Sequence, residues 1–294
     1  MPGYVLSCCS TADLTHEWLE RRDIKYLLFN YFLDGRPCKD DFGATNSPAE
    51  LYAKMLAGAD AKTSQISAGD YMAHFEQFLA KGLDVVHVTL SSGISGTYNS
   101  ACAARDQLAE KYPQQRVYVV DSLAASSGYG LLMDKLADLR DDGMGAAELV
   151  DWANEHKGEV QHWFFSSDLT FFIRGGRISK AAGLVGGMLK ICPVMDVAPD
   201  GSLAVKEKIR TKAKAQKRIV EKMVELADGG LDYSGKCFIS QSECLDDARE
   251  VARQVEATFP HLDGKVEIFD IGATIGVHTG PGTVALFFWG KKRA

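Results

Sequence analysis

Short apolar runs alternate with amphipathic helical patterns along the first half of the chain. Four runs predict β-strands, at 4–7, 26–32, 85–90 and 117–120. The spacing of apolar residues predicts helices at 95–112, 125–140 and 146–156, and a capping box with proline at the first helical position predicts another at 47–50. Strands that alternate with helices are typical of βαβ units, so we expect an α/β fold with a parallel sheet.

The second half of the chain has a different order of elements. A strand at 160–166 precedes a short helix and the turn Arg174-Gly175-Gly176-Arg177, and Asp200-Gly201 predicts a hairpin. A helix is expected from about 206 to 226, with eight basic and two acidic residues between Lys206 and Lys222. The break at Lys157-Gly158 predicts two domains: a parallel-sheet N-terminal α/β domain, residues 1–157, and a mixed α/β C-terminal domain, residues 158–294.

The segment 271–290 is long enough to cross a bilayer and carries no Lys, Arg, Asp or Glu. However, His278-Thr279-Gly280-Pro281-Gly282 interrupts it in the middle. We therefore expect two strands around a loop and no stable membrane insertion. The first 14 residues have no basic region ahead of their apolar stretch, so neither a signal peptide nor a lipoprotein leader is expected.

Composition narrows the classes of function. The chain has 294 residues, 46% apolar and 24% charged, and its formal charge of −6 argues against a nucleic-acid partner. Its seven cysteines form no CxxC pair, and no histidine cluster stands near them at metal-ligand spacing. We expect reduced thiols, no metal and a cytoplasmic location.

The strongest local signal is the segment 90–98, which follows an apolar strand and opens a helix. Free backbone N–H groups at the helix start, with the hydroxyls of Ser91, Ser92, Ser95 and Thr97, predict an anion site. The serines are alternatively simple N-caps. The segment lacks the lysine of a Walker loop and the final glycine of a nucleophile elbow.

Four weaker signals each have a structural alternative. Lys62-Thr63-Ser64-Gln65 is a polar cluster or an ordinary loop before a helix cap, and His278 is a functional or a structural histidine. Arg174 and Arg177 bind an anion or form surface ion pairs, and the basic helix is a docking face or a solvated one.

Together these segments resemble the DegV family of bacterial fatty-acid-binding proteins. The motifs that carry the resemblance are, in chain order, KTSQIS, SSGISGTYNSA, VVDS, FFIRGGRIS, LKICPVMDVAPDGSL, EKIRTKAKA and IGATIGVHTGPGT. The resemblance covers essentially the whole chain. The resemblance implies a two-domain DegV-like (EDD-type) α/β fold that encloses one long-chain fatty acid, such as palmitate, between its domains, with no cofactor.

The resemblance also implies roles for single residues. Thr63 and Ser95 are expected to hold the carboxylate, with His278 close to it. Further candidate contacts, with the head group or with a partner, are Ser64, Ser92, Gly96, Arg174, Arg177 and Arg210. The implied partner is a separate fatty acid kinase that makes acyl-phosphate, so the protein itself is expected to be a carrier without catalytic residues.

One position departs from the family pattern, and three other functions stay open. Cys9 stands where family members usually have an aspartate, so any role of that acid is in doubt. The serine-rich turn and His278 also fit a serine-dependent acyl hydrolase or a phosphotransferase subunit. A regulatory protein that senses a lipid would use the same pocket.

Overall fold

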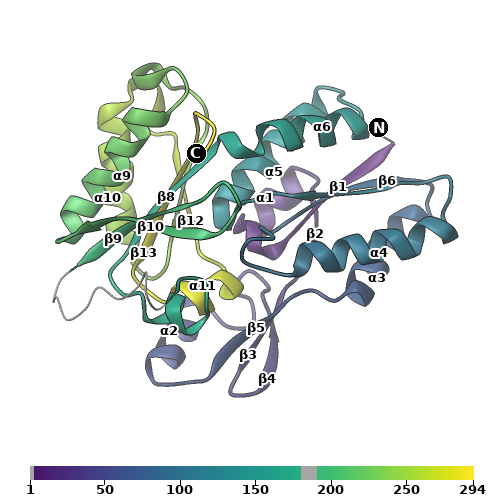
Figure 1. Ribbon diagram of the computed structural model, residues 1–294, viewed down its shortest axis with the longest axis horizontal. Helices are drawn as coiled ribbons and strands as arrows, with labels where there is room; N and C mark the ends of the chain where they lie inside the picture. The colour runs from purple at the N-terminus through teal and green to yellow at the C-terminus, as the bar shows by residue number, and fades with distance from the viewer. Residues whose placement is uncertain (1–2, 180–190) are drawn as a thin grey trace.

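The computed structural model describes residues 3–179 and 191–294. Its strands form three sheets, with helices packed on the faces of the two larger ones (Figure 1). In chain order the described strands are β1 (Tyr4–Cys9), β2 (Lys25–Leu27), β3 (Asn30–Leu33), β4 (Arg36–Lys39), β5 (Ala61–Ser64), β6 (Asp84–Thr89), β7 (Val117–Asp121), β8 (Val160–Ser166), β9 (Cys192–Val197), β10 (Leu203–Ile209), β11 (Cys237–Gln241), β12 (Val266–Asp270) and β13 (Thr283–Trp289). The described α-helices are α1 (His16–Arg21), α2 (Pro48–Leu56), α3 (Ala68–Leu79), α4 (Thr97–Lys111), α5 (Ser126–Asp141), α6 (Ala146–His156), α7 (Thr170–Arg174), α9 (Lys212–Leu226), α10 (Leu245–Thr258) and α11 (Ala273–Thr279).

The first large sheet is parallel, with strand order β2-β1-β6-β7. Side chains alternate between its faces, so Leu6 and Val86 pack toward α5 and α6, whereas Val85 packs toward α3 and α4. Because helices cover both faces, the strands are nearly continuous apolar runs. The predicted parallel sheet is confirmed.

The second large sheet is mixed, with strand order β10-β9-β8-β13-β11-β12. β11 and β12 run parallel, and the other neighbouring pairs run antiparallel. α9 and α10 cover one face, and α5 packs on the other (Figure 1). The predicted hairpin at Asp200-Gly201 joins β9 to β10, and Gly201 adopts the positive φ of 80° that its turn requires.

A small third sheet, with order β4-β3-β5, corrects the predicted single strand at 26–32. β2 pairs with β1 in the parallel sheet, whereas β3 pairs with β4 and β5, so the chain crosses between two sheets at Leu28 and Phe29. One continuous apolar run gives no sign of such a crossing, because both of its parts are extended and at least partly buried.

Two further element predictions are wrong. The basic segment begins as strand β10, and helix α9 starts at Lys212, where the Thr211 side chain accepts a hydrogen bond from Lys214 N. The predicted pair of strands at 271–290 is α11 followed by β13. Glycines at 272 and 276 weaken the helical pattern there, so the local sequence alone does not predict α11.

The two large sheets use separate parts of the chain, 4–121 and 160–289. The domain boundary between residues 157 and 158 itself stays a prediction. Among the described helices, none combines the length and the apolar character that crossing a bilayer requires.

Candidate functional site

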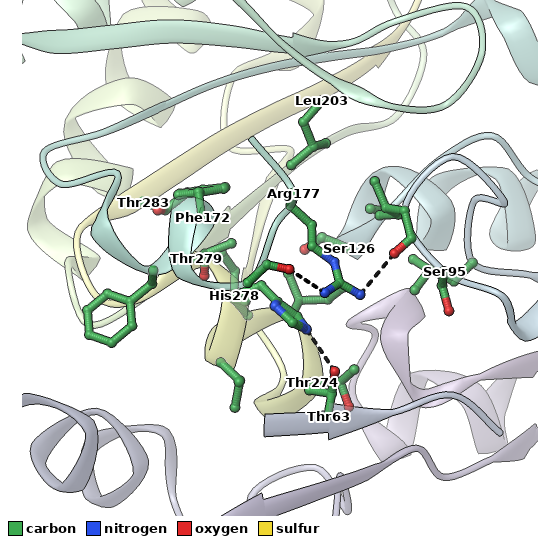
Figure 2. Close-up of a pocket in the computed structure, with 18 of the residues that line it drawn as sticks. Thr63, Ser95, Ser126, Phe172, Arg177, Leu203, Thr274, His278, Thr279 and Thr283 are labelled. Atoms are coloured by element: carbon green, nitrogen blue, oxygen red, sulfur yellow. Dashed lines mark hydrogen bonds between the residues drawn. The ribbon is translucent and has the colours of Figure 1, made fainter. Parts of the chain in front are cut away.

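A cavity of about 740 Å³ lies between the mixed sheet, the small sheet and the loops that follow β6 and β7. This volume is in the range of small-molecule sites. Much of its wall is apolar, and the apolar residues include Phe29, Leu90, Ile94, Phe164, Phe171, Phe172, Val197, Leu203, Ile271, Ile275, Val277 and Phe287. The side chains of Thr63, Ser95, Arg177 and His278 lie near one another at one part of the wall (Figure 2).

Thr63 and His278 form a hydrogen-bonded pair at the cavity wall. Thr63 lies on β5 and His278 on the last turn of α11, and 2.7 Å separates Thr63 Oγ1 from His278 Nε2 (Figure 2). Burial, and secondarily the charge of Arg177, lowers the pKa of His278 to about 4. The imidazole is therefore neutral near pH 7 and carries a single N–H.

The surroundings of His278 decide which ring nitrogen carries that proton. Among the described residues, no group hydrogen-bonds to its buried Nδ1. A buried N–H without an acceptor is less favourable than an unfilled lone pair, so the proton belongs on Nε2. His278 then donates to Thr63 Oγ1. The Thr63 hydroxyl hydrogen is left free to donate to an anion in the cavity.

Ser95 offers a second hydroxyl donor from the loop between β6 and α4. Its Oγ accepts a hydrogen bond from Thr97 N at 3.3 Å, which leaves the hydroxyl hydrogen available. The expectation of an anion contact is wrong for Ser91 and Thr97, because their buried hydroxyls are hydrogen-bonded to Gly201 O and Tyr71 OH. Gly96, and not a serine, occupies the N-cap position of α4, although Ser95 just before it bonds the backbone N–H of the first helical residue, Thr97.

Arg177 connects two sides of the cavity. Its guanidinium donates to Gly175 O at 2.6 Å and to Ile94 O at 3.0 Å, across the gap between the turn after α7 and the loop after β6 (Figure 2). Burial lowers the pKa of Arg177, yet a guanidinium stays charged near pH 7. A positive charge therefore lies beside the hydroxyl donors.

The structure brings most of the predicted site residues to this one cavity. Those that line it are Thr63, Ser92, Ser95, Gly96, Arg174, Arg177 and His278. Ser64 is not part of the lining, although its neighbour Thr63 is, and Arg210 is exposed between β10 and α9. The roles of these residues toward a ligand stay predictions.

Sequence reasoning missed several other cavity residues. Ser126, His162, Thr274 and Thr283 all line the cavity and are all buried. His162 and Thr283 lie on strands of the mixed sheet, where local sequence does not show which face meets a cavity. A polar residue in a mainly apolar strand, such as His162 in β8, is a signal that could have pointed to the cavity.

Comparison with known proteins identifies the family. Residues 9–291 match the family model described as "Uncharacterised protein, DegV family". The chain belongs to the DegV family. A DegV domain-containing protein of Clostridium perfringens is 32% identical over 293 residues, which cover 100% of this chain and 99% of the relative. The resemblance inferred from the motifs is confirmed.

Solved DegV structures share the fold. DegV from Bacillus subtilis, described as a fatty acid binding protein, superposes with a TM-score of 0.83 at 27% identity, over 99% of this chain and 100% of the other. The Streptococcus pneumoniae Fatty Acid Kinase (Fak) B3 protein, loaded with linoleic acid, gives 0.84 at 22% identity, over 99% and 100% of the two chains. At 22% identity this second likeness shows the fold alone. The expected DegV-like architecture is confirmed.

Proposed function

We propose that this DegV-family protein binds one long-chain fatty acid, such as palmitate, and presents its carboxylate to a fatty acid kinase for acyl-phosphate formation. The observation that carries the proposal is the Thr63–His278 pair in the wall of an apolar cavity. The carboxylate accepts hydrogen bonds from Thr63 and Ser95, and the acyl chain lies between the proposed domains 1–157 and 158–294. The protein is a carrier and performs no covalent chemistry of its own.

The acyl chain and the head group contribute differently to binding. Burying about 14 methylenes at about 0.8 kcal/mol each stabilises the complex by a gross amount on the order of 11 kcal/mol. A hydrogen bond to a charged group contributes only about 1.5–3 kcal/mol. The chain therefore supplies most of the affinity, and the polar groups fix where the carboxylate lies.

The arrangement around His278 favours binding over acyl hydrolysis or a phosphotransferase subunit. A serine nucleophile needs a hydrogen-bonded base, and that base needs an orienting partner. His278 Nε2 is bonded to Thr63 rather than to Ser95, and within the described residues nothing bonds to Nδ1.

Exposed residues at the cavity and on the basic segment support a kinase as the partner. The pneumococcal neighbour carries Fatty Acid Kinase in its name, which is said of that protein. In this chain, the exposed residues Ser92 and Arg174 line the cavity near the head group, so a phosphoryl donor has a short path to the carboxylate. Arg210 is exposed and has no ion-pair partner in the part of the chain that the structure describes. We assign it to contact with the kinase.

The double variant Thr63→Ala with Ser95→Ala tests the head-group site. We expect its affinity for palmitate to fall by at least about a hundredfold, because two hydrogen bonds to a charged carboxylate are lost. Isothermal titration calorimetry on delipidated protein measures this. Arg210→Ala is the matched control: it binds palmitate like the unmodified protein, but a purified fatty acid kinase with ATP phosphorylates its bound lipid more slowly.

Two results would count against the proposal. Unchanged palmitate affinity in the double variant removes Thr63 and Ser95 from the head-group role. Phosphorylation of the Arg210→Ala complex at the normal rate places kinase docking elsewhere.

A further inference from the structure

The small sheet lies against both ends of α11. Lys39 of β4 and Ser64 of β5 both pair with Asn30 of β3, so these two outer strands finish at the same end of the sheet. Outer strands of a three-stranded sheet are about 10 Å apart. A seven-residue helix such as α11 is about 10 Å long, so it can reach from one outer strand to the other. Figure 1 shows α11 beside this sheet.

Asp40, the residue directly after β4, holds the first turn of α11. Asp40 is 2% exposed, and its two carboxylate oxygens accept hydrogen bonds from Ala273 N at 2.9 Å and from Thr274 N at 3.1 Å. Gly272 stands at the N-cap position and has no side chain to cap the helix. A residue more than 230 positions earlier in the sequence thus supplies the cap of α11.

Asp40 is itself fixed in place. Its backbone N donates to Phe29 O at 2.9 Å, and Ser10 Oγ donates to its carboxylate at 3.3 Å. At the other end of the helix, His278 on the last turn is bonded to Thr63 on β5. The same small sheet therefore sets both the start of α11 and the partner of its last histidine.

We propose that Asp40 is a positioning residue for the fatty acid carboxylate. By holding the first turn of α11, it fixes where His278 meets Thr63, and so where the Thr63 hydroxyl points into the cavity. A helix of two turns moves as one body, so loss of its cap displaces His278. This inference rests on the proposed function, because the Thr63–His278 pair is the proposed carboxylate site.

Two variants weaken the cap in different ways. Asp40→Asn keeps the shape of the side chain but removes its charge and one of its two acceptors. Ala273→Pro keeps Asp40 and removes one donor, and proline is well tolerated at the first position of a helix. Asp41→Asn is the matched control, because the carboxylate of Asp41 bonds to Thr45 in the neighbouring loop.

The variants are compared in two measurements on delipidated protein. The imidazole ¹⁵N chemical shifts of His278 report its hydrogen bond without any ligand, and calorimetry reports palmitate affinity. We expect Asp40→Asn to move the His278 shifts and to weaken palmitate binding about tenfold, as for one charge-assisted hydrogen bond. In a His278→Ala background the same substitution should change affinity less than about twofold. Ala273→Pro acts in the same direction, and Asp41→Asn changes neither quantity.

Other results would overturn the positioning role of Asp40 or the proposed function. An equal loss of affinity in both backgrounds makes Asp40 merely structural and overturns the inference, as do unchanged His278 shifts in Asp40→Asn. If Asp40→Asn does not fold, the His278 shifts and the palmitate affinity of Ala273→Pro, measured in both backgrounds, test the inference in its place. If the unmodified protein binds no palmitate, the proposed function fails, while the His278 shifts still decide whether Asp40 positions the imidazole.

Discussion

At the scale of single residues, the site depends on how closely a backbone approaches His278. A Cβ added at Gly175 would lie 2.3 Å from His278 Nδ1 and 3.2 Å from Phe171 O. Neither a helix backbone nor a packed imidazole can move aside at small cost. Glycine at this position therefore allows His278 to reach Thr63.

Gly175→Ala should displace the imidazole and break its bond to Thr63. We expect palmitate affinity to fall about tenfold and the free energy of unfolding to fall by about 1–3 kcal/mol. Calorimetry with palmitate and urea denaturation measure the two effects. Gly158→Ala is the control, since a Cβ there meets open space. If Gly175→Ala and Gly158→Ala have the same palmitate affinity and the same free energy of unfolding, then neither quantity depends on the close approach of Gly175 to His278.

Cys9, at the position where the resemblance implies an aspartate, belongs to a buried polar network rather than to the cavity. Its Sγ lies 3.3 Å from Tyr71 OH and 3.6 Å from His87 Nε2, and Tyr71 OH lies 2.8 Å from Thr97 Oγ1. Burial raises the pKa of Cys9 to about 12, so the thiol is protonated and neutral. A neutral thiol both donates and accepts in this network, which an ionised aspartate cannot do.

At the scale of elements, the sequence predicts a helix or a turn correctly where the contacts that stabilise it are between near neighbours in the chain. The capping box at Ser47 begins α2, and Asp200-Gly201 forms its hairpin. The prediction fails at α11, whose cap comes from Asp40, and at 26–32, where two sheets share one apolar run. Both failures have one cause: partners that are distant in sequence decide the local conformation.

Local composition also led to a wrong prediction for the start of the basic segment, which is a strand and not a helix. Leu203, Val205 and Ile209 on β10 lie an even number of positions apart, as strand periodicity requires, but the charged run Lys206-Glu207-Lys208 interrupts the alternation and obscures it. Several of these basic side chains form ion pairs within the protein, among them Arg218 with Glu207 and Lys212 with Asp247. Arg210 differs from these two in forming no ion pair with any described residue, so it remains the docking candidate.

At the scale of the whole molecule, the motifs predicted the fold class and the family, and most of the proposed site residues line one cavity. The cavity itself could not be derived from composition. An apolar fraction of 46% describes a filled core and a hollow one equally well. Residues such as Phe287 and His162 line the cavity because of how two sheets and α5 pack, and sequence spacing does not encode that packing.

Buried histidines make the stability of the molecule depend on pH. Burial lowers the pKa of His74 to about 4, below its ordinary value of about 6.5. The unfolded chain therefore binds the proton more tightly, so the stabilisation is full above pH 6.5 and is lost as the pH falls toward 4. We expect His74 to account for about 3 kcal/mol of lost unfolding free energy between pH 7 and pH 4.

His74→Gln isolates this contribution, because glutamine can keep hydrogen bonds to Ser7 and Gln77 without titrating. Urea denaturation at pH 7 and pH 4 should show a smaller pH dependence for this variant than for the unmodified protein. His261→Gln, at an exposed position, should leave the dependence unchanged. An identical dependence in His74→Gln would show that folding does not lower the pKa of His74.

The most direct test of the proposed function is the mass spectrum of an organic extract from the purified protein. The apolar cavity and its hydroxyl donors predict close to one long-chain fatty acid per protein, and the same spectrum reports its length and unsaturation. Absence of any fatty acid from well-folded protein, together with no binding of added palmitate, would contradict the proposal.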